Sequence, residues 1–197
     1  LRMIKTRHHR KKLILFLIIT FTLLLPLNVR SEGTANEIII KASSALVKLK
    51  LMVGDEKGNL KLNDNLKRCE FVTLVNRMMM YDINEGTKND NIPFTDVNKN
   101  HWAYSNINTA ISYGLINGYT DNTFRPDNNV TFVEAQAVLL RALGYKDEIG
   151  KNWPDDVIKK SSELRLDNNL KIDINKPLTR GEAAVLVYNA LTIDFKK

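Results

Sequence analysis

The chain has 197 residues, with 29 Lys and Arg against 22 Asp and Glu, and a single cysteine. Seven of the basic residues and none of the acidic ones precede Glu32, so the remaining part carries 22 charges of each sign and is formally neutral. Positive charge confined to one terminal segment does not indicate a nucleic-acid partner, and one cysteine excludes an intramolecular disulfide.

The first 31 residues have the pattern of a signal peptide. Basic residues between Arg2 and Lys12 precede an apolar run over residues 13–25, and residues 29–31 offer small side chains at the spacing for cleavage before Glu32. The 13-residue run is short for a membrane span, which needs roughly 20 residues; an uncleaved membrane anchor is the alternative. Export of a chain that forms no disulfide suits a bacterial cell envelope.

A helix-loop-helix pattern follows and recurs along the chain. Apolar residues at helical spacing predict a helix over residues 38–52 that Gly54 ends, then a polar loop and a second helix that begins near Arg68. At a constant offset of 64, residues 51–67 match residues 115–131, so that Gly54 corresponds to Gly118. We therefore place a first repeat, which is partial, at residues 38–83.

The second and third repeats differ in how much of the pattern they keep. The second, residues 92–146, adds a lead-in with Asp96 and Trp102 before a helix over residues 104–113. The third, residues 152–195, keeps the last helix after Thr179, but its loop has no glycine and its lead-in no counterpart of Trp102. Residues 84–91 and 146–152 are predicted linkers. Because one such unit cannot bury its apolar faces alone, we expect three units stacked around a shared core, and hence an all-α fold.

Two threonine–glutamate pairs fit the capping box, in which each side chain bonds the other residue's backbone amide. They are Thr131 with Glu134 and Thr179 with Glu182, whereas Lys67 replaces the threonine in the first repeat and predicts a weaker cap. A structural role is expected for these glutamates, with catalysis as the alternative. No paired acid, nucleophile with a base, or phosphate-binding loop accompanies them, so no enzyme activity is expected.

The first turns of two helices carry an arginine. Exposed amides and the positive end of the helix dipole favour an anion there, and Arg68 or Arg180 can complete a carboxylate or phosphate site with a bidentate contact. The alternative is a solvated surface arginine. Phe132 occupies this place in the second repeat and makes no such contact. Only His101 lies beyond the signal segment, so neither a metal site nor a cofactor is expected.

Residues 94–145 resemble a complete S-layer homology repeat, and their neighbours resemble partial copies. The residues that carry the resemblance are Phe94-Thr95-Asp96-Val97, His101-Trp102-Ala103, Ala110, Gly114-Leu115-Ile116-Asn117-Gly118-Tyr119, Asp121, Thr123-Phe124-Arg125-Pro126-Asp127 and Thr131-Phe132-Val133-Glu134-Ala135.

The resemblance implies three repeats packed as a pseudo-threefold helical spindle that binds secondary cell-wall polysaccharide non-covalently, often through a pyruvylated sugar. It also implies that arginines contact the ligand's carboxylate and that grooves between repeats draw on the lead-in and on the loop glycine. The matching positions are Arg68, Arg180, Asp96, Trp102, Gly118 and Gly54.

Two functions remain open on these grounds. The first is a secreted, non-catalytic module of the bacterial cell wall that binds an anionic, pyruvylated polysaccharide, with Trp102 as a platform for a sugar ring. The second is a structural or protein-interaction module whose glycan sites have decayed, with surface proteins as partners; Phe132 and the missing lead-ins motivate it.

Overall fold

The computed structural model describes residues 34–83 and 92–196; the predicted signal peptide and the first predicted linker lie outside these ranges. Within them the chain is helical, which confirms the all-α class, and no helix is both long and apolar enough to cross a membrane. The elements are α2 (Ala35–Lys48), α3 (Arg68–Met78), α4 (Tyr104–Ser112), α5 (Phe132–Ala142), the short 3-10 helix η2 (Lys146–Glu148), α6 (Asp155–Glu163) and α7 (Arg180–Ala190).

Capping boxes start α5 and α7. The Glu134 carboxylate accepts the Thr131 N–H at 3.0 Å and the Thr131 hydroxyl accepts the Glu134 N–H at 3.4 Å; Thr179 and Glu182 repeat both bonds at 2.8 and 3.2 Å. Lysine has no acceptor, so α3 keeps only half of the box, in which Glu70 accepts from the backbone of its N-cap residue at 2.8 Å.

The first helix ends earlier than predicted. It stops at Lys48, and Lys50 takes the left-handed conformation with φ 59°, as Gly114 and Arg165 do after α4 and α6. Gly54 therefore does not end the helix. A Cβ on Gly54 would lie 2.6 Å from the backbone of Gly58, so the glycine is needed because the loop folds closely back on itself.

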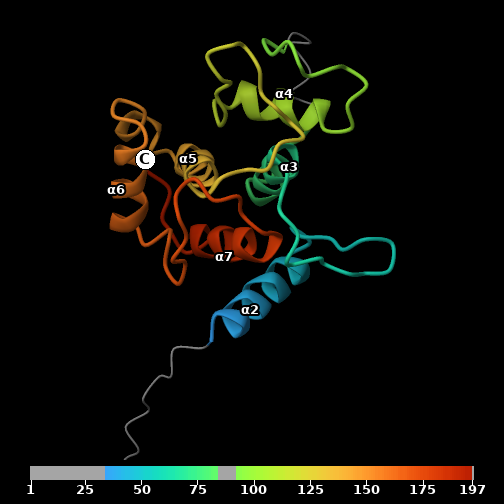
Figure 1. The fold of residues 1–197 in the computed structure, drawn as a ribbon, viewed down its shortest axis with the longest axis vertical. Coiled ribbons are helices and arrows are strands. Elements are labelled where there is room, and N and C mark those ends of the chain that lie inside the picture. Colours follow the sequence, from blue (N-terminus) through green and yellow to red (C-terminus); the bar gives the residue numbers. More distant parts are fainter. Residues whose placement is uncertain (1–33, 84–91, 197) are drawn as a thin grey trace, which may run out of the picture. The chain divides into compact units, whose positions relative to one another are not determined.

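The helices pair across repeats rather than within them (Figure 1). The first helix of each repeat packs on the second helix of another: α2 on α7, α4 on α3, and α6 on α5. The three second helices α3, α5 and α7 also contact one another. No repeat keeps its own pair of helices together, so each one buries its apolar face only when the others are present.

A ring of backbone hydrogen bonds joins the loops that lead into the second helices. Leu66 donates to Leu178 at 2.8 Å, Leu178 to Val130 at 2.9 Å, and Val130 back to Leu66 at 2.9 Å. Beside this ring, the first amide of each second helix donates to a loop of another repeat; the donors and acceptors are Arg68 and Asn128, Phe132 and Lys176, and Arg180 and Asp64. The residue in each first turn is therefore held against a neighbouring repeat.

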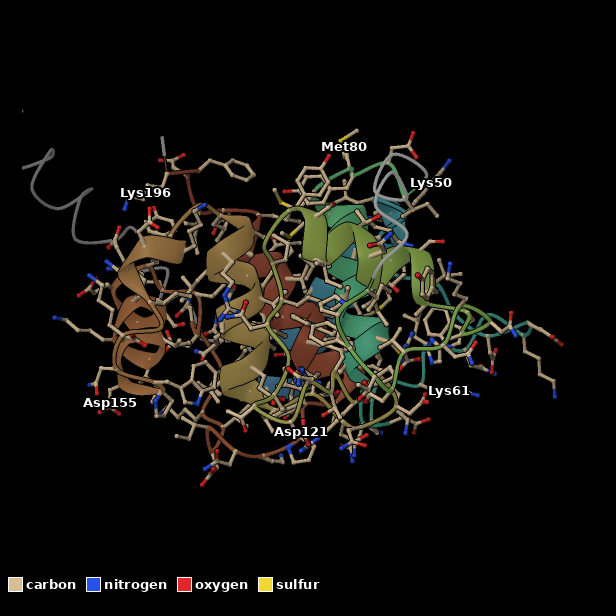
Figure 2. All side chains as sticks on the ribbon, turned by 90° about the horizontal axis from the view of Figure 1, so that it is seen from above. Lys50, Lys61, Met80, Asp121, Asp155 and Lys196 are labelled. Atoms are coloured by element: carbon tan, nitrogen blue, oxygen red, sulfur yellow. The ribbon has the colours of Figure 1, made fainter. Side chains whose placement is uncertain are left out.

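The second predicted linker is packed rather than free. Residues 146–148 form η2, Ile149 is buried, and Glu148 pairs with Lys160 at 2.6 Å and with Lys196. The loops before α3 and α5, marked by Lys61 and Asp121, lie toward the lower edge of the view in Figure 2. Each of these two loops lines one candidate binding groove.

Candidate binding grooves

The first groove brings together residues from three repeats around Arg180 and has a volume of about 520 Å³. Arg180 comes from α7, Gly54 from the loop of the first repeat, and Trp102 from the lead-in of the second. One face of α3 forms the wall, with Glu70, Thr73, Leu74 and Arg77 at successive turns. We call this the Arg180 groove. The structure thus brings Arg180, Gly54 and Trp102 together across repeat boundaries.

The second groove has the same construction around Arg68 and a volume of about 470 Å³. Arg68 comes from α3, Gly118 from the loop of the second repeat, and Trp153 from the segment before α6. The wall is the equivalent face of α5, with Glu134, Ala137, Val138 and Arg141. We call this the Arg68 groove.

Trp153 is a residue that sequence reasoning missed. It stands two residues before α6, as Trp102 stands two residues before α4, and both are exposed, at 50% and 61%. The inference that the third repeat lacks a counterpart of Trp102 was therefore wrong. An alignment of the second and third repeats could have found it. An offset of 51 residues matches Trp102 with Trp153, and it also matches Leu115 with Leu166, which are both buried and follow α4 and α6.

Asp96 lines neither groove. Its carboxylate accepts the backbone N–H groups of Phe124 and Arg125 at 2.8 and 2.7 Å. These two bonds hold the lead-in of the second repeat against the loop of the same repeat. The role of Asp96 in the structure is therefore to anchor the lead-in.

Both first-turn arginines are bonded to the protein rather than solvated. Arg68 donates from Nε to the Phe124 carbonyl at 2.9 Å, and its Nη1 lies 2.9 Å from Glu134. Arg180 donates in the same way to the Leu60 carbonyl at 2.8 Å, but its Nη1 lies 3.6 Å from Glu70. The ion pair of the Arg180 groove is therefore the looser one.

Aromatic rings enclose the Arg68 guanidinium. Its carbon lies 4.9 Å from the centre of the Tyr119 ring and 4.8 Å from that of Phe124, and the residue is 8% exposed. The Tyr119 hydroxyl donates to Glu134 at 2.6 Å. Burial, together with this bond, raises the pKa of Tyr119. Burial also acts to raise the pKa of Glu134, but Arg68 and the hydrogen bonds outweigh it and hold that pKa below its ordinary value.

The rims of the two grooves differ. At the offset of 64 residues, Tyr119 corresponds to Asp55 and Arg125 to Lys61. The Arg125 guanidinium stacks on Tyr119 at 4.0 Å, whereas Lys61 lies 3.5 Å from the Asp55 carboxylate. The Arg68 groove therefore has an aromatic rim and the Arg180 groove a charged one.

Among the described residues, the equivalent positions between the second and third repeats do not complete a third groove. Phe132 stands in place of the arginine and is 4% exposed, and Asn189 stands in place of Arg77 and Arg141. The loop of the third repeat carries no glycine, and both tryptophans of the chain already belong to the other two grooves.

Similarity to known proteins identifies the family of this chain. The model of the S-layer homology domain matches residues 93–135. A cell surface protein of Thermoanaerobacter kivui is 35% identical over 146 residues, which cover 74% of this chain and 18% of that protein. A middle cell wall protein of Brevibacillus brevis is 31% identical over 78% of this chain and 14% of its own length. A cellulosome-anchoring protein of Acetivibrio thermocellus is 26% identical, with 70% and 38% covered.

The chain carries an S-layer homology domain. The family match and the surface-protein relatives assign this chain to the bacterial cell surface, as predicted, as a module of the cell-wall anchoring type. The chain spans 14% to 38% of the length of these three relatives. Some similar proteins carry enzyme names, and there the matched part is 13% of the length or less.

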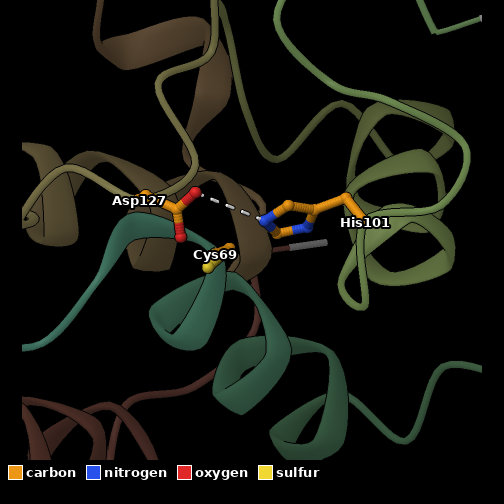
Figure 3. A group of neighbouring side chains, drawn as sticks. All are labelled: Cys69, His101 and Asp127. Carbon is orange, nitrogen blue, oxygen red and sulfur yellow. Dashed lines mark ion pairs between the residues drawn. The ribbon is translucent and has the colours of Figure 1, made fainter.

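Among the described residues of this S-layer homology protein, Cys69, His101 and Asp127 form a cluster with ligand atoms of the metal-binding kind, all within 4.8 Å of one another (Figure 3). His101 Nε2 lies 3.6 Å from Asp127, and Nδ1 accepts the Ala103 N–H at 3.1 Å. Since a neutral imidazole has one protonated nitrogen, this bond puts the proton on Nε2, where a metal needs a lone pair. Burial raises the pKa of Cys69 to about 12, so its thiol stays protonated. The arrangement favours hydrogen-bonded packing over metal binding.

Proposed function

We propose that the chain attaches to the cell wall by binding an anionic secondary cell-wall polysaccharide, non-covalently, in the Arg68 and Arg180 grooves. The observation that carries this proposal is the shared construction of the two grooves. Each combines an arginine, a closely folded glycine loop and an exposed tryptophan, and takes one from each repeat.

The chemistry of the grooves suits an acidic sugar. Volumes of about 470 and 520 Å³ lie in the usual range for ligand pockets, roughly 300 to 1,000 Å³. An exposed tryptophan at the edge offers a flat apolar face to the C–H side of a sugar ring. Guanidinium groups along the wall offer the forked N–H donors that bind a carboxylate such as that of a pyruvyl group.

The glutamates of the grooves have structural partners, which supports binding over hydrolysis. Glu134 accepts hydrogen bonds from Thr131 and Tyr119 and pairs with Arg68. These contacts favour the ionised carboxylate, which cannot donate a proton to a leaving group. Glu182 lines neither groove; it caps α7 and pairs with Lys176 at 3.4 Å. Glycoside cleavage needs two carboxyl groups about 5 to 10 Å apart, one of which acts as the acid. Among the described residues, the lining of the Arg68 groove holds a single carboxyl group, that of Glu134. The Arg180 groove holds Asp55, Asp64 and Glu70, but Asp55 accepts two backbone N–H groups of its own loop and Glu70 caps α3.

Co-sedimentation of residues 32–197 with cell-wall sacculi tests the proposal. Intact sacculi are compared with sacculi from which the secondary polysaccharide has been extracted. Binding to the first and its loss with the second are expected. Binding that survives extraction would place the ligand in peptidoglycan instead, and no binding to either preparation would favour the protein-interaction module.

A further inference from the structure

The wall of the Arg68 groove carries a second arginine that forms no ion pair with the described residues. Arg141 stands seven residues after Glu134 on α5, which is two helical turns along the same face, and it lines the groove together with Arg68 and Trp153. Arg68, which pairs with Glu134 at 2.9 Å, and Arg141 therefore lie near opposite ends of the α5 wall.

Arg141 is half-buried and has few partners. Its Nη1 donates to the Leu115 carbonyl at 3.3 Å, and no carboxylate of the described residues lies within ion-pair distance of it. Burial lowers the pKa of Arg141, and Asp156 opposes this from a greater distance. One oxygen of the Asp156 carboxylate is itself held by the backbone N–H groups of Lys151 and Asn152 at 2.8 and 2.9 Å. A guanidinium that has lost part of its water and whose counter-charge lies beyond ion-pair distance favours the arrival of an anion.

Arg68 is in the opposite situation. Glu134 lies 2.9 Å from its Nη1 and neutralises its charge, a backbone carbonyl takes its Nε, and two aromatic rings cover it. These contacts fix the loop of the second repeat against α3. Arg68 is thus suited to hold the groove in shape.

We propose that Arg141 is the residue that binds the acidic group of the glycan in the Arg68 groove, while Arg68 acts as a positioning residue. This inference rests on the proposed function. A sugar carboxylate that enters the groove meets the free N–H donors of Arg141, and the ring of the same sugar lies against Trp153 at the edge. The uncharged part of the ligand faces the apolar wall between them, which includes Ala137 and Val138.

The Arg180 groove supplies the matched control. Arg77 is the equivalent of Arg141 and donates to the Leu51 carbonyl at 3.4 Å, but it is exposed. Water already solvates this charge, so a ligand carboxylate gains less from it. The Arg68 groove is therefore the stronger anion site of the two.

The test is calorimetric titration of residues 32–197 with purified oligosaccharide from the wall polysaccharide, before and after chemical reduction of its carboxyl groups. Arg141→Gln should weaken binding of the acidic oligosaccharide about 10- to 100-fold, as for loss of a charge-assisted hydrogen bond. Arg77→Gln should weaken it less than about threefold. With the reduced oligosaccharide, Arg141→Gln and the wild type should bind alike.

The variants distinguish a loss of binding from a loss of stability. Arg141→Gln removes a partly desolvated charge and should melt no lower than the wild type, and Arg141→Lys, which keeps the charge but loses the fork, should bind with intermediate affinity. Wild-type affinity in both variants would overturn the role of Arg141 alone. Absence of binding by the wild type would overturn the proposed function itself.

Discussion

At the scale of single residues, the grooves separate side chains that hold the structure from side chains that are free to meet a ligand. Arg68 is buried and forms an ion pair with the half-buried Glu134, whereas Trp102 and Trp153 are exposed at the groove edges, at 61% and 50%. Removal of Arg68 would leave the half-buried Glu134 without its counter-charge, at a cost of about 3 kcal/mol. The exposed tryptophans are thus the better probes of binding.

Trp102→Ala and Trp153→Ala should each weaken binding to wall oligosaccharide about tenfold, and the double variant should bind weakest, because each groove loses its stacking surface. Melting temperatures should stay within about 2 °C of the wild type, since both rings are exposed. Phe195→Ala is the control, because Phe195 is 61% exposed and lines neither groove. Equal loss of binding in all three variants would contradict the grooves as the site.

The Glu134 carboxylate predicts a pH dependence of stability. Its pKa is lower in the folded chain than in the unfolded one, so its contribution is complete above the unfolded pKa of about 4.3 and is lost as pH falls below that value and through the folded one. Glu134→Gln should therefore cost about 1 to 3 kcal/mol at pH 7 and much less at pH 3.

Glu182→Gln is the matched control for this change. Glu182 makes the same capping bonds but pairs with an exposed lysine rather than a buried arginine. Urea unfolding at both pH values measures the difference. A pH-independent cost of Glu134→Gln, or an equal cost at Glu182, would show that the ion pair with Arg68 contributes nothing.

At the scale of helices and loops, close contacts between repeats limit side-chain size. A Cβ on Gly181 would lie 2.7 Å from Cγ2 of Ile39 on α2 and 3.1 Å from the Leu62 carbonyl. The same helix position holds Cys69 in α3 and Val133 in α5, so the glycine reflects the pairing of α2 with α7 in particular.

Gly181→Ala should destabilise the fold by about 1 to 2 kcal/mol, since overpacking exceeds the helix-propensity gain of alanine. Ile39→Ala opens space at the same point. In a double-mutant cycle the two changes together should cost less than the sum of their separate costs. Simple additivity would show that α2 and α7 do not press against each other here.

The sequence predicted the repeated elements well and the partners of each element poorly. The start of each second helix followed from the apolar period and the threonine–glutamate caps. The end of α2 was misplaced because Lys50, and not a glycine, takes the left-handed conformation. Trp153 was missed because the lead-in before it is shortened. Asp96 was expected in a groove, but a carboxylate in a loop can equally bond neighbouring backbone amides, and the sequence pattern does not distinguish these.

At the scale of the whole molecule, interlocked pairing predicts that the repeats unfold together. Trp102 reports on the second repeat and Trp153 on the third, so Trp153→Phe and Trp102→Phe leave one fluorescent probe each. In each variant the fluorescence transition should coincide with the loss of helical circular dichroism during urea unfolding. Transitions at different urea concentrations within one variant would indicate repeats that fold independently.

In the part of the chain that the structure describes, two complete grooves and one incomplete set of positions give the number of glycan sites that the proposed function predicts. Phe132 and Asn189 stand where the other repeats supply two arginines, so the third interface lacks both cations. The chain should therefore bind two short glycan chains at once and no more. Two sites on one molecule also raise the effective affinity for a wall that presents many copies of the ligand.

The stoichiometry of binding tests this account most directly. Calorimetric titration of residues 32–197 with short, purified oligosaccharides of the secondary wall polysaccharide should give two sites per chain, of unequal affinity, and Trp153→Ala should weaken the tighter one about tenfold. Three equivalent sites, or two affinities that neither Trp102→Ala nor Trp153→Ala changes, would contradict the assignment of the glycan to the Arg68 and Arg180 grooves.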